Sequence, residues 1–295
     1  MTFLQAIVLG IVQGLTEFIP ISSTGHLVLA SRAIGLYEGV DKTLQAQQTT
    51  ATIAVIQLGT LLAVLAYFWR DIISISFAFT RDHVALLRGN RPEQRANWLS
   101  HDAWLGWLVI LGSVPVGIVG LLFKDQIEGP FTKNLWVIAT MLIVVAVLLG
   151  IAEMVSKRNR LMADLGVRDA LAVGFAQVLA LIPGSSRSGS TIMAGLLVGE
   201  TRETAARFSF LLSMPAIAAS GLLELKEAIE KLPPGSYGAL VVATLVSGVV
   251  GYASIWFLLR FLRTHSTGIF IGYRVILGGV IIILLLAGVV SAPID

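Results

Sequence analysis

Four ionisable side chains fall within the long apolar stretches of this 295-residue sequence: Glu17, His26, Arg187 and Arg274. A charged group at membrane depth is costly, so each of them is a candidate functional group. All except Arg274 lie in or beside two short segments that are rich in Ser, Gly and Pro. A carboxylate, an imidazole and a guanidinium beside many hydroxyls indicate chemistry on a phosphate-like anion.

The two polar segments, 19–26 and 182–190, each precede a stretch that can form a helix. Their hydroxyl residues are typical N-caps, and a helix N-terminus offers free N–H groups and a positive dipole end to an anion. If both ends converge on Arg187, they form a cradle for a multiply charged oxyanion such as a diphosphate. The alternative is that these Ser, Gly and Pro residues only form turns and loops and bind no ligand. The candidate binding residues are Ser22, Ser23, Thr24, Gly25, Gly184, Ser185, Ser186, Ser188 and Gly189.

Ser23 and His26 are the candidates for nucleophilic and acid–base chemistry. They are three residues apart and can share one face of a helix. A serine hydroxyl is a useful nucleophile only beside a base or a metal, and histidine can act as that base or as an acid for the leaving group. The alternative is that His26 is a helix-end residue that reaches the membrane interface, which is the commoner case for a histidine taken alone.

Glu17 has several interpretations, because it sits at the end of the helix that enters the first polar segment. It could orient His26, hold a divalent cation, act as a base, or simply form an ion pair with Arg187. Gln13 lies four residues earlier on the same helical face and could add a carbonyl ligand for the cation. Arg274 could bind phosphate or pair with Glu17, and the sequence leaves both open.

The elements that must position these residues are membrane helices. The chain is 56% hydrophobic and 13% charged, whereas soluble domains are roughly 45–50% apolar and about 25% charged. This composition predicts a polytopic membrane protein and argues against nucleic-acid binding, a soluble dinucleotide-binding enzyme or a disordered scaffold. The absence of cysteine excludes disulfides, thiolate metal sites and cysteine phosphatases, and the absence of a G-x-x-x-x-G-K-[ST] loop argues against an ATP-driven pump.

Two kinds of apolar region are present. A hydrocarbon core of about 30 Å needs roughly 20 helical residues. Regions 3–33 and 169–199 are each split by a polar segment into halves of roughly 12–15 residues, too short to cross. We therefore expect each to form a re-entrant helical hairpin, whose broken backbone is lined by protein or water. Full spans are expected at approximately 50–69, 104–123, 135–154, 208–226, 238–260 and 269–290.

The two split regions resemble each other. Gly10 and Gln13 match Gly174 and Gln177, and Pro20-Ile21-Ser22-Ser23 matches Pro183-Gly184-Ser185-Ser186 with one residue of slippage. We therefore expect a single integral membrane domain over 1–295, all-α, built from two repeats at about 1–155 and 168–291. Each repeat has a hairpin and three spans, so the second enters the membrane inverted. Inverted repeats place a site near the midplane.

The basic residues orient this arrangement. Segments 70–103, 156–168, 201–207 and 260–268 are expected on one side, and they are richer in Lys and Arg than the segments on the other side. By the positive-inside rule the richer side is cytoplasmic, with both termini outside. The richer side holds Arg70, Arg81, Arg88, Arg91, Arg95, Lys157, Arg158, Arg160, Arg168, Arg202, Arg207, Arg260 and Arg263, and the other holds Arg32, Lys42, Lys124, Lys133, Lys226 and Lys231.

The motifs in this order resemble the undecaprenyl-diphosphate phosphatase family, also called the bacitracin resistance proteins. The similarity runs over essentially the whole chain and includes a Gln/Glu-x-x-x-Glu pattern whose first position is Gln13 here, where other members have Glu. The matching motifs are Gln13-Gly14-Leu15-Thr16-Glu17-Phe18, Pro20, Ser22-Ser23-Thr24-Gly25-His26, Phe68-Trp69-Arg70, Pro183-Gly184-Ser185-Ser186-Arg187-Ser188-Gly189 and Phe208-Ser209-Phe210-Leu211-Leu212.

The resemblance implies an enzyme of the bacterial inner membrane that hydrolyses undecaprenyl diphosphate to the monophosphate and inorganic phosphate. This reaction recycles the carrier for peptidoglycan synthesis and confers bacitracin resistance. The resemblance also implies a divalent cation, such as Mg²⁺ or Ca²⁺, at Glu17 and Gln13, a site open to the periplasm, and functional roles for Glu17, Ser23, His26 and Arg187. Membrane lipid is the other expected partner, and a homodimer is left open.

A prenyl-lipid flippase or secondary transporter is the alternative function, since inverted repeats are usual in carriers. A Ser–His pair beside an arginine is more than binding requires, which favours the enzyme.

Overall fold

The computed structural model describes residues 1–89, 99–123, 134–232 and 235–292, apart from the side chains of 42, 43, 46, 220 and 222–231. These residues form helices, and the bridge between Arg160 and Glu200 is not part of a sheet. The predicted all-α class is confirmed for this part of the chain. The helices that carry the argument below are α1 (Phe3–Phe18), α2 (Ser23–Ala33), α3 (Lys42–Tyr67), α4 (Trp69–Leu87), α5 (His101–Leu122), α7 (Leu135–Val155), α8 (Val167–Val178), α9 (Arg187–Leu197), α10 (Arg202–Lys231), α11 (Tyr237–Leu262) and α12 (Gly268–Leu286).

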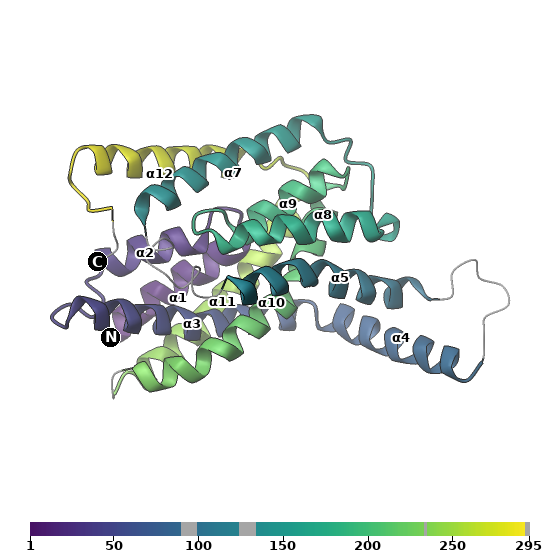
Figure 1. Cartoon of the computed structure of the whole chain (residues 1–295), viewed down its shortest axis with the longest axis horizontal. Coiled ribbons are helices and arrows are strands. Elements are labelled where there is room, and N and C mark those ends of the chain that lie inside the picture. The colour runs from purple at the N-terminus through teal and green to yellow at the C-terminus, as the bar shows by residue number, and fades with distance from the viewer. Residues whose placement is uncertain (90–98, 124–133, 233–234, 293–295) are drawn as a thin grey trace.

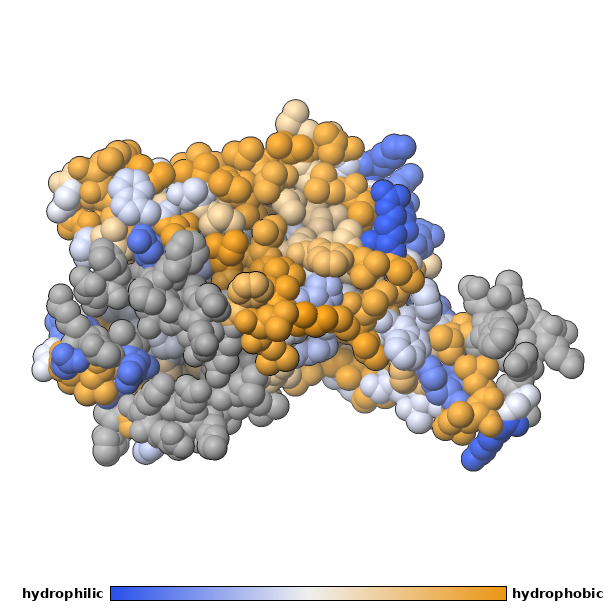
Figure 2. Space-filling model, viewed as in Figure 1, coloured by the Kyte–Doolittle hydropathy of each residue, from blue (hydrophilic) through white to orange (hydrophobic). Residues whose placement is uncertain are grey.

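Helices α3, α5, α7, α11 and α12 are long and apolar enough to cross a membrane. They match five of the six predicted spans. The remaining predicted span, 208–226, lies within α10, and many side chains of this helix are not described. That α10 crosses the membrane stays a prediction. Many of the long helices run along the longest axis of the molecule, with the N-terminus toward one end (Figure 1). On the face shown in Figure 2, apolar residues cover the middle and hydrophilic residues gather toward the ends.

The two split regions form helical hairpins, as predicted: α1 packs against α2, and α8 packs against α9. A 16-residue helix such as α1 rises about 24 Å, less than the hydrocarbon thickness of about 30 Å. Each entering helix ends before a proline, because the preceding residue is pushed out of the helical region. Ile19 (ψ 135°) and Ile182 (ψ 120°) are both extended.

The two hairpin turns share a local conformation. Ser22 (φ 77°) and Ser186 (φ 68°) each have a positive φ immediately before the returning helix. Ser22 is therefore equivalent to Ser186, and Ser23 to Arg187, so the pairing of Ser23 with Ser186 in the sequence match is corrected. The one-residue slippage is confined to the two prolines. The inversion of the two repeats, about 1–155 and 168–291, stays a prediction.

Glycines hold the entering helices close to their neighbours. A Cβ atom on Gly10 of α1 would lie 2.6 Å from the carbonyl oxygen of Ala243 in α11, and one on Gly14 would lie 2.8 Å from that of Ser247. Gly174 of α8 lies equally close to the backbone of Gly112 in α5. Small residues permit such close approach between membrane helices. This explains why Gly10 and Gly174 match in the sequence.

Helix α4 is an element that the sequence did not predict, because residues 70–103 were assigned only to a connecting segment. It packs against α5 and extends with it from the body of the molecule (Figure 1). Its apolar side chains are interrupted by Arg70, Asp71, Arg81 and Asp82. A search for uniformly apolar stretches therefore passes over it.

The segments assigned to one side by their charge meet at one end of the bundle, hereafter the polar end. Glu153 at the end of α7 accepts hydrogen bonds from Arg158, Arg202 and Thr267. Further ion pairs join Arg207 to Asp71 and Arg263 to Glu203. The grouping of these segments is thus observed. Arg91, Arg95, Lys124 and Lys133, and the side chains of Lys42, Lys226 and Lys231, lie outside the described residues.

A buried acid lies where the second hairpin opens at the polar end. Glu200 is fully buried, and neither carboxylate oxygen has a hydrogen-bond partner among the described residues. Burial, reinforced by the nearby Asp169 carboxylate, raises the pKa of Glu200 from 4.5 to about 8. Arg160 is already engaged by Asp169. Glu200 is therefore protonated in the folded protein at neutral pH.

We expect this group to make the folded protein less stable as the pH rises. Between pH 4.5 and about 8 the native state holds a proton on Glu200 that the unfolded chain has lost, so the stabilisation falls across this window, by on the order of a few kcal/mol. Thermal unfolding in detergent should show that Glu200→Gln flattens this dependence. Glu203→Gln is the control, because Glu203 is a partly exposed acid close to Glu200 in the sequence that pairs with Arg263, and it should keep the dependence. An unchanged slope in Glu200→Gln would contradict the assignment.

Candidate functional site

Arg274 joins the turns of both hairpins. Its guanidinium is fully buried and donates to Pro20 O of the first turn (3.2 Å) and to Gly184 O and Ser185 O of the second (both 3.0 Å). It also donates to Met141 O and Leu142 O in α7. These contacts give Arg274 a structural role that holds the two turns together, and Glu17 is not among its partners. Direct phosphate binding by Arg274 would compete with these carbonyls.

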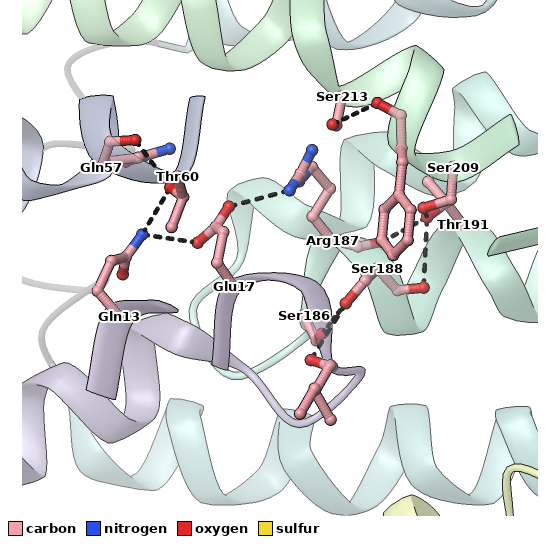
Figure 3. Close-up of polar contacts among 12 residues, drawn as sticks. Gln13, Glu17, Gln57, Thr60, Ser186, Arg187, Ser188, Thr191, Ser209 and Ser213 are labelled. Atoms are coloured by element: carbon pink, nitrogen blue, oxygen red, sulfur yellow. Dashed lines mark hydrogen bonds and ion pairs between the residues drawn. The ribbon is translucent and has the colours of Figure 1, made fainter. Parts of the chain in front are cut away.

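The first and second hairpins also meet through an ion pair. Arg187, the first residue of α9, donates from Nη2 to Glu17 Oε1 at 3.0 Å (Figure 3). Both side chains are largely buried, with exposed fractions of 13% and 8%. Ser188 Oγ adds a hydrogen bond of 3.3 Å to Ile19 O. The structure thus brings together two residues that lie 170 positions apart, and it forms the ion pair that was one of the interpretations of Glu17 left open by the sequence.

The ion pair continues into a polar chain across α1 and α3. Gln13 Nε2 donates to Glu17 Oε2 at 3.0 Å and lies 3.3 Å from Thr60 Oγ1, which donates to Gln57 O (Figure 3). Thr60 was not singled out from the sequence. The only feature that could have identified Thr60 is a hydroxyl side chain within a mainly apolar span, and many membrane helices contain such residues.

Several buried polar atoms of the site have no partner among the described residues. They include Arg187 Nη1 and Gln13 Oε1, together with the hydroxyls of Ser185 and Ser190. An unpaired buried donor or acceptor costs about 1–3 kcal/mol. Arg187 Nη1 is a free donor of the kind that binds an anion, and Gln13 Oε1 a free acceptor of the kind that binds a cation or a donor group.

The two helix N-termini at the turns differ. Ser186 caps α9, accepting a hydrogen bond from Gly189 N at 3.2 Å, and its hydroxyl also lies 3.2 Å from that of Ser188. Ser22 occupies the corresponding position of α2 but makes no side-chain cap. The expectation that hydroxyls cap both helices holds only for α9. The first-turn N–H groups of α2, from Ser23 to Gly25, stay available to an anion.

His26 lies on α2 with both ring nitrogens engaged. Nδ1 is 2.7 Å from Ser22 O, and Nε2 is 2.6 Å from the hydroxyl of Tyr273 in α12. The Ser23 hydroxyl makes no hydrogen bond within the described part of the chain. The expected Ser23–His26 contact is therefore not formed here, nor is one between Glu17 and His26. The sequence did not identify Tyr273, which lies 247 residues from its partner.

The donors fit a divalent cation shared with phosphate better than a preformed metal cage. In the residues that the structure describes, no cluster of three or more His, Asp or Glu side chains could hold a metal. Glu17 supplies one carboxylate and Gln13 an unpartnered buried amide oxygen. A Mg²⁺ ion typically takes one or two carboxylates and completes its shell with water and substrate phosphates.

A family model and several named relatives match this chain over nearly its whole length. Residues 6–280 match the family model described as "Bacitracin resistance protein BacA". A protein named undecaprenyl-diphosphatase from Syntrophobacter fumaroxidans is 53% identical over 282 residues, covering 96% of this chain and 97% of its own length. Proteins of the same name from Mycolicibacterium vanbaalenii and Chlorobium phaeovibrioides are each 46% identical, covering 99% and 97% of this chain and 100% and 98% of their own lengths.

Proposed function

The chain belongs to the family of bacitracin resistance proteins, and from this premise we propose that it is an undecaprenyl-diphosphatase. It hydrolyses undecaprenyl diphosphate to undecaprenyl phosphate and inorganic phosphate, which returns the lipid carrier to peptidoglycan synthesis and confers bacitracin resistance. The observation that carries the proposal is the buried Arg187, which joins the two hairpins and keeps Nη1 without a partner in the described structure. The full-length relatives favour this reading over a flippase or transporter.

The diphosphate is bound where the hairpin turns meet. Arg187 Nη1 and the uncapped N–H groups at the start of α2 donate to phosphate oxygens. Donors already held in place before the reaction stabilise the charge that develops in the transition state without a cost of reorganisation. The Glu17–Arg187 pair, supported by Gln13, keeps the guanidinium in that orientation.

Ser23 is our choice of nucleophile, because it begins α2 and its hydroxyl is not engaged. Its oxygen attacks the terminal phosphorus, the bond to the bridging oxygen breaks, and undecaprenyl phosphate leaves. His26 takes the serine proton and gives it to the bridging oxygen of the leaving undecaprenyl phosphate. Neutral again, it takes a proton from the water that attacks the phosphoserine and returns it to Ser23 Oγ as inorganic phosphate leaves. Both steps require its ring to leave Ser22 O or Tyr273. Direct attack by His26 or by water is the rival route.

A divalent cation, Mg²⁺ or Ca²⁺, would be held by Glu17 and Gln13 together with the diphosphate. When bound it supplies neutralisation of phosphate charge. Gln13 Oε1 is the observation that supports the cation, because this buried acceptor has no partner in the described structure.

The prenyl tail leaves the site along apolar surface between helices. A hollow of about 300 Å³ is lined mainly by apolar residues of α2, α7 and α12, among them Leu29, Leu135 and Ile281. It lies toward the far end of α2 from Ser23, so one helix can guide the tail as well as bind the diphosphate. We place the protein in the bacterial inner membrane with this site open to the periplasm and the polar end in the cytoplasm.

Phosphate release from undecaprenyl diphosphate by the purified protein in detergent tests the proposal. We expect release that a chelator suppresses and that Ser23→Ala lowers by at least about a hundredfold. Ser31→Ala is the matched control, because it removes a hydroxyl from the same helix away from the turn. A well-folded wild-type protein that releases no phosphate would exclude the enzyme and favour the carrier.

Trapping the reaction with substrate labelled on the terminal phosphate separates the chemical routes. Attack by Ser23 predicts labelled protein that Ser23→Ala abolishes. Label that persists in Ser23→Ala and disappears in His26→Gln would assign the attack to His26, and turnover without labelled protein would favour water.

A further inference from the structure

A second hollow lies at the polar end of the bundle, away from the hairpin turns, where α3, α10 and α11 meet. It has a volume of about 100 Å³ and is lined by Tyr67, Arg207, Trp256, Leu259, Arg260 and Arg263. Arginine and aromatic side chains therefore make up most of its wall. A single phosphate group, a few water molecules in size, fits such a space.

The positive charge of this hollow is only partly neutralised. Arg207 pairs with Asp71 at 2.8 Å, and Arg263 pairs with Glu203 at 2.7 Å. Arg260 has no acidic partner among the described residues and stacks on Trp256, with its guanidinium carbon 5.8 Å from the ring centroid. The hollow thus keeps one uncompensated positive charge.

A buried donor in the same wall also lacks a partner. Arg207 Nε is inaccessible to solvent, and no hydrogen-bond acceptor contacts it within the described residues. Nη2, on the same edge of this guanidinium as Nε, donates to Asp71 Oδ1 at 2.8 Å, and the guanidinium carbon lies 5.7 Å from the Phe68 ring centroid. This N–H is shielded from the hollow, but the Arg207 side chain as a whole is 32% exposed and lines it, so its guanidinium adds positive charge to the wall.

The depth of the hollow suits the head group of a membrane lipid. The candidate spans Gln47–Tyr67 and Tyr237–Leu262 both end at this level. Trp256, 54% exposed, and its neighbour Phe257, 44% exposed, offer an apolar surface beside the arginines. Aromatic side chains of this kind mark the membrane interface, and basic pockets between membrane helices bind anionic head groups.

We propose that this hollow is a binding site for the phosphate of an anionic phospholipid, with Arg260 and Arg207 as its ligands. The acyl chains of that lipid lie against Trp256 and Phe257. The site is separate from the diphosphate site and is occupied whether or not substrate turns over.

Native mass spectrometry of the full-length protein, with phosphatidylglycerol or phosphatidylcholine added in detergent, tests this proposal. We expect a one-to-one complex with phosphatidylglycerol that Arg260→Gln weakens about tenfold, the loss of one charge-assisted hydrogen bond. Arg70→Gln is the matched control, since Arg70 also stacks on a tryptophan, at 5.3 Å, but does not line the hollow. It should bind the lipid as the wild-type protein does.

Three outcomes would overturn the assignment. Equal retention of phosphatidylcholine would show that the site does not select anionic lipid. If Arg70→Gln weakened phosphatidylglycerol binding as much as Arg260→Gln does, the effect would come from the general surface charge and not from this hollow. Displacement of the lipid by millimolar inorganic phosphate at constant ionic strength would identify free phosphate as the ligand. Binding is measured without turnover, so the result does not depend on the proposed hydrolysis.

Discussion

Arg187→Lys is expected to lower the rate of diphosphate hydrolysis about a hundredfold to a thousandfold, while the protein stays folded. Lysine keeps the positive charge but not the planar fork that reaches Glu17 and phosphate together. In the structure Nη2 is committed to Glu17 and Nη1 is unpartnered within the described residues. Loss of one preorganised donor to a developing oxyanion has an effect of about this size. Steady-state phosphate release in detergent measures it.

Arg81→Lys is the matched control for this substitution, because Arg81 also pairs with a carboxylate, Asp82 at 2.7 Å, but lies on α4 outside the site. It should retain wild-type turnover. Near-normal turnover by a folded Arg187→Lys protein would contradict a bidentate role and reduce Arg187 to a simple positive charge. Equal loss in both variants would point to a general effect of arginine replacement.

The components of the site could be predicted from the sequence because ionisable residues are so costly in apolar segments. Glu17 and Arg187 were conspicuous for that reason, and their contact followed from two hairpins meeting at their turns. The partners of His26 could not be predicted in the same way. Tyr273 lies in the last long helix, and an aromatic residue in such a helix has no distinguishing local pattern.

Helix positions were predictable to the extent that length and hydropathy determine them. Apolar length identified α3, α5, α7, α11 and α12, and the proline and serine residues identified the two broken hairpins. Helix α4 was missed because its polar face hides it from a search for apolar spans. The difference between the capped α9 and the uncapped α2 depends on side-chain rotation at Ser186 and Ser22, which the shared motif does not reveal.

The same motif therefore serves two purposes in this protein. In the second hairpin, the Ser186 hydroxyl caps the N-terminus of its own helix, and Arg187 is the group directed toward the first hairpin. In the first, Ser23 takes the position that corresponds to Arg187, at a helix end whose N–H groups are uncapped by Ser22. Related turns thus place a cation on one side of the proposed site and an anion-binding helix end with a hydroxyl on the other.

Arg274→Met is expected to destabilise the protein before it affects chemistry. The substitution removes the guanidinium donor from five carbonyl oxygens, three in the hairpin turns and two within α7. The cost should be at least about 3 kcal/mol, or on the order of 10 °C in apparent melting temperature. Thermal unfolding in detergent measures it, with Arg70→Met, an exposed arginine, as the control that should melt as the wild-type protein does.

The comparison of Arg274 with Arg187 separates positioning from substrate binding. If Arg274 only holds the turns together, turnover per folded molecule of Arg274→Met should recover toward wild type at low temperature, where the turns are still in place. Arg187→Lys should keep its reduced turnover at every temperature. An Arg274→Met protein that melts normally yet fails to turn over would restore the phosphate-binding role, because its five carbonyl contacts would then be dispensable for the fold.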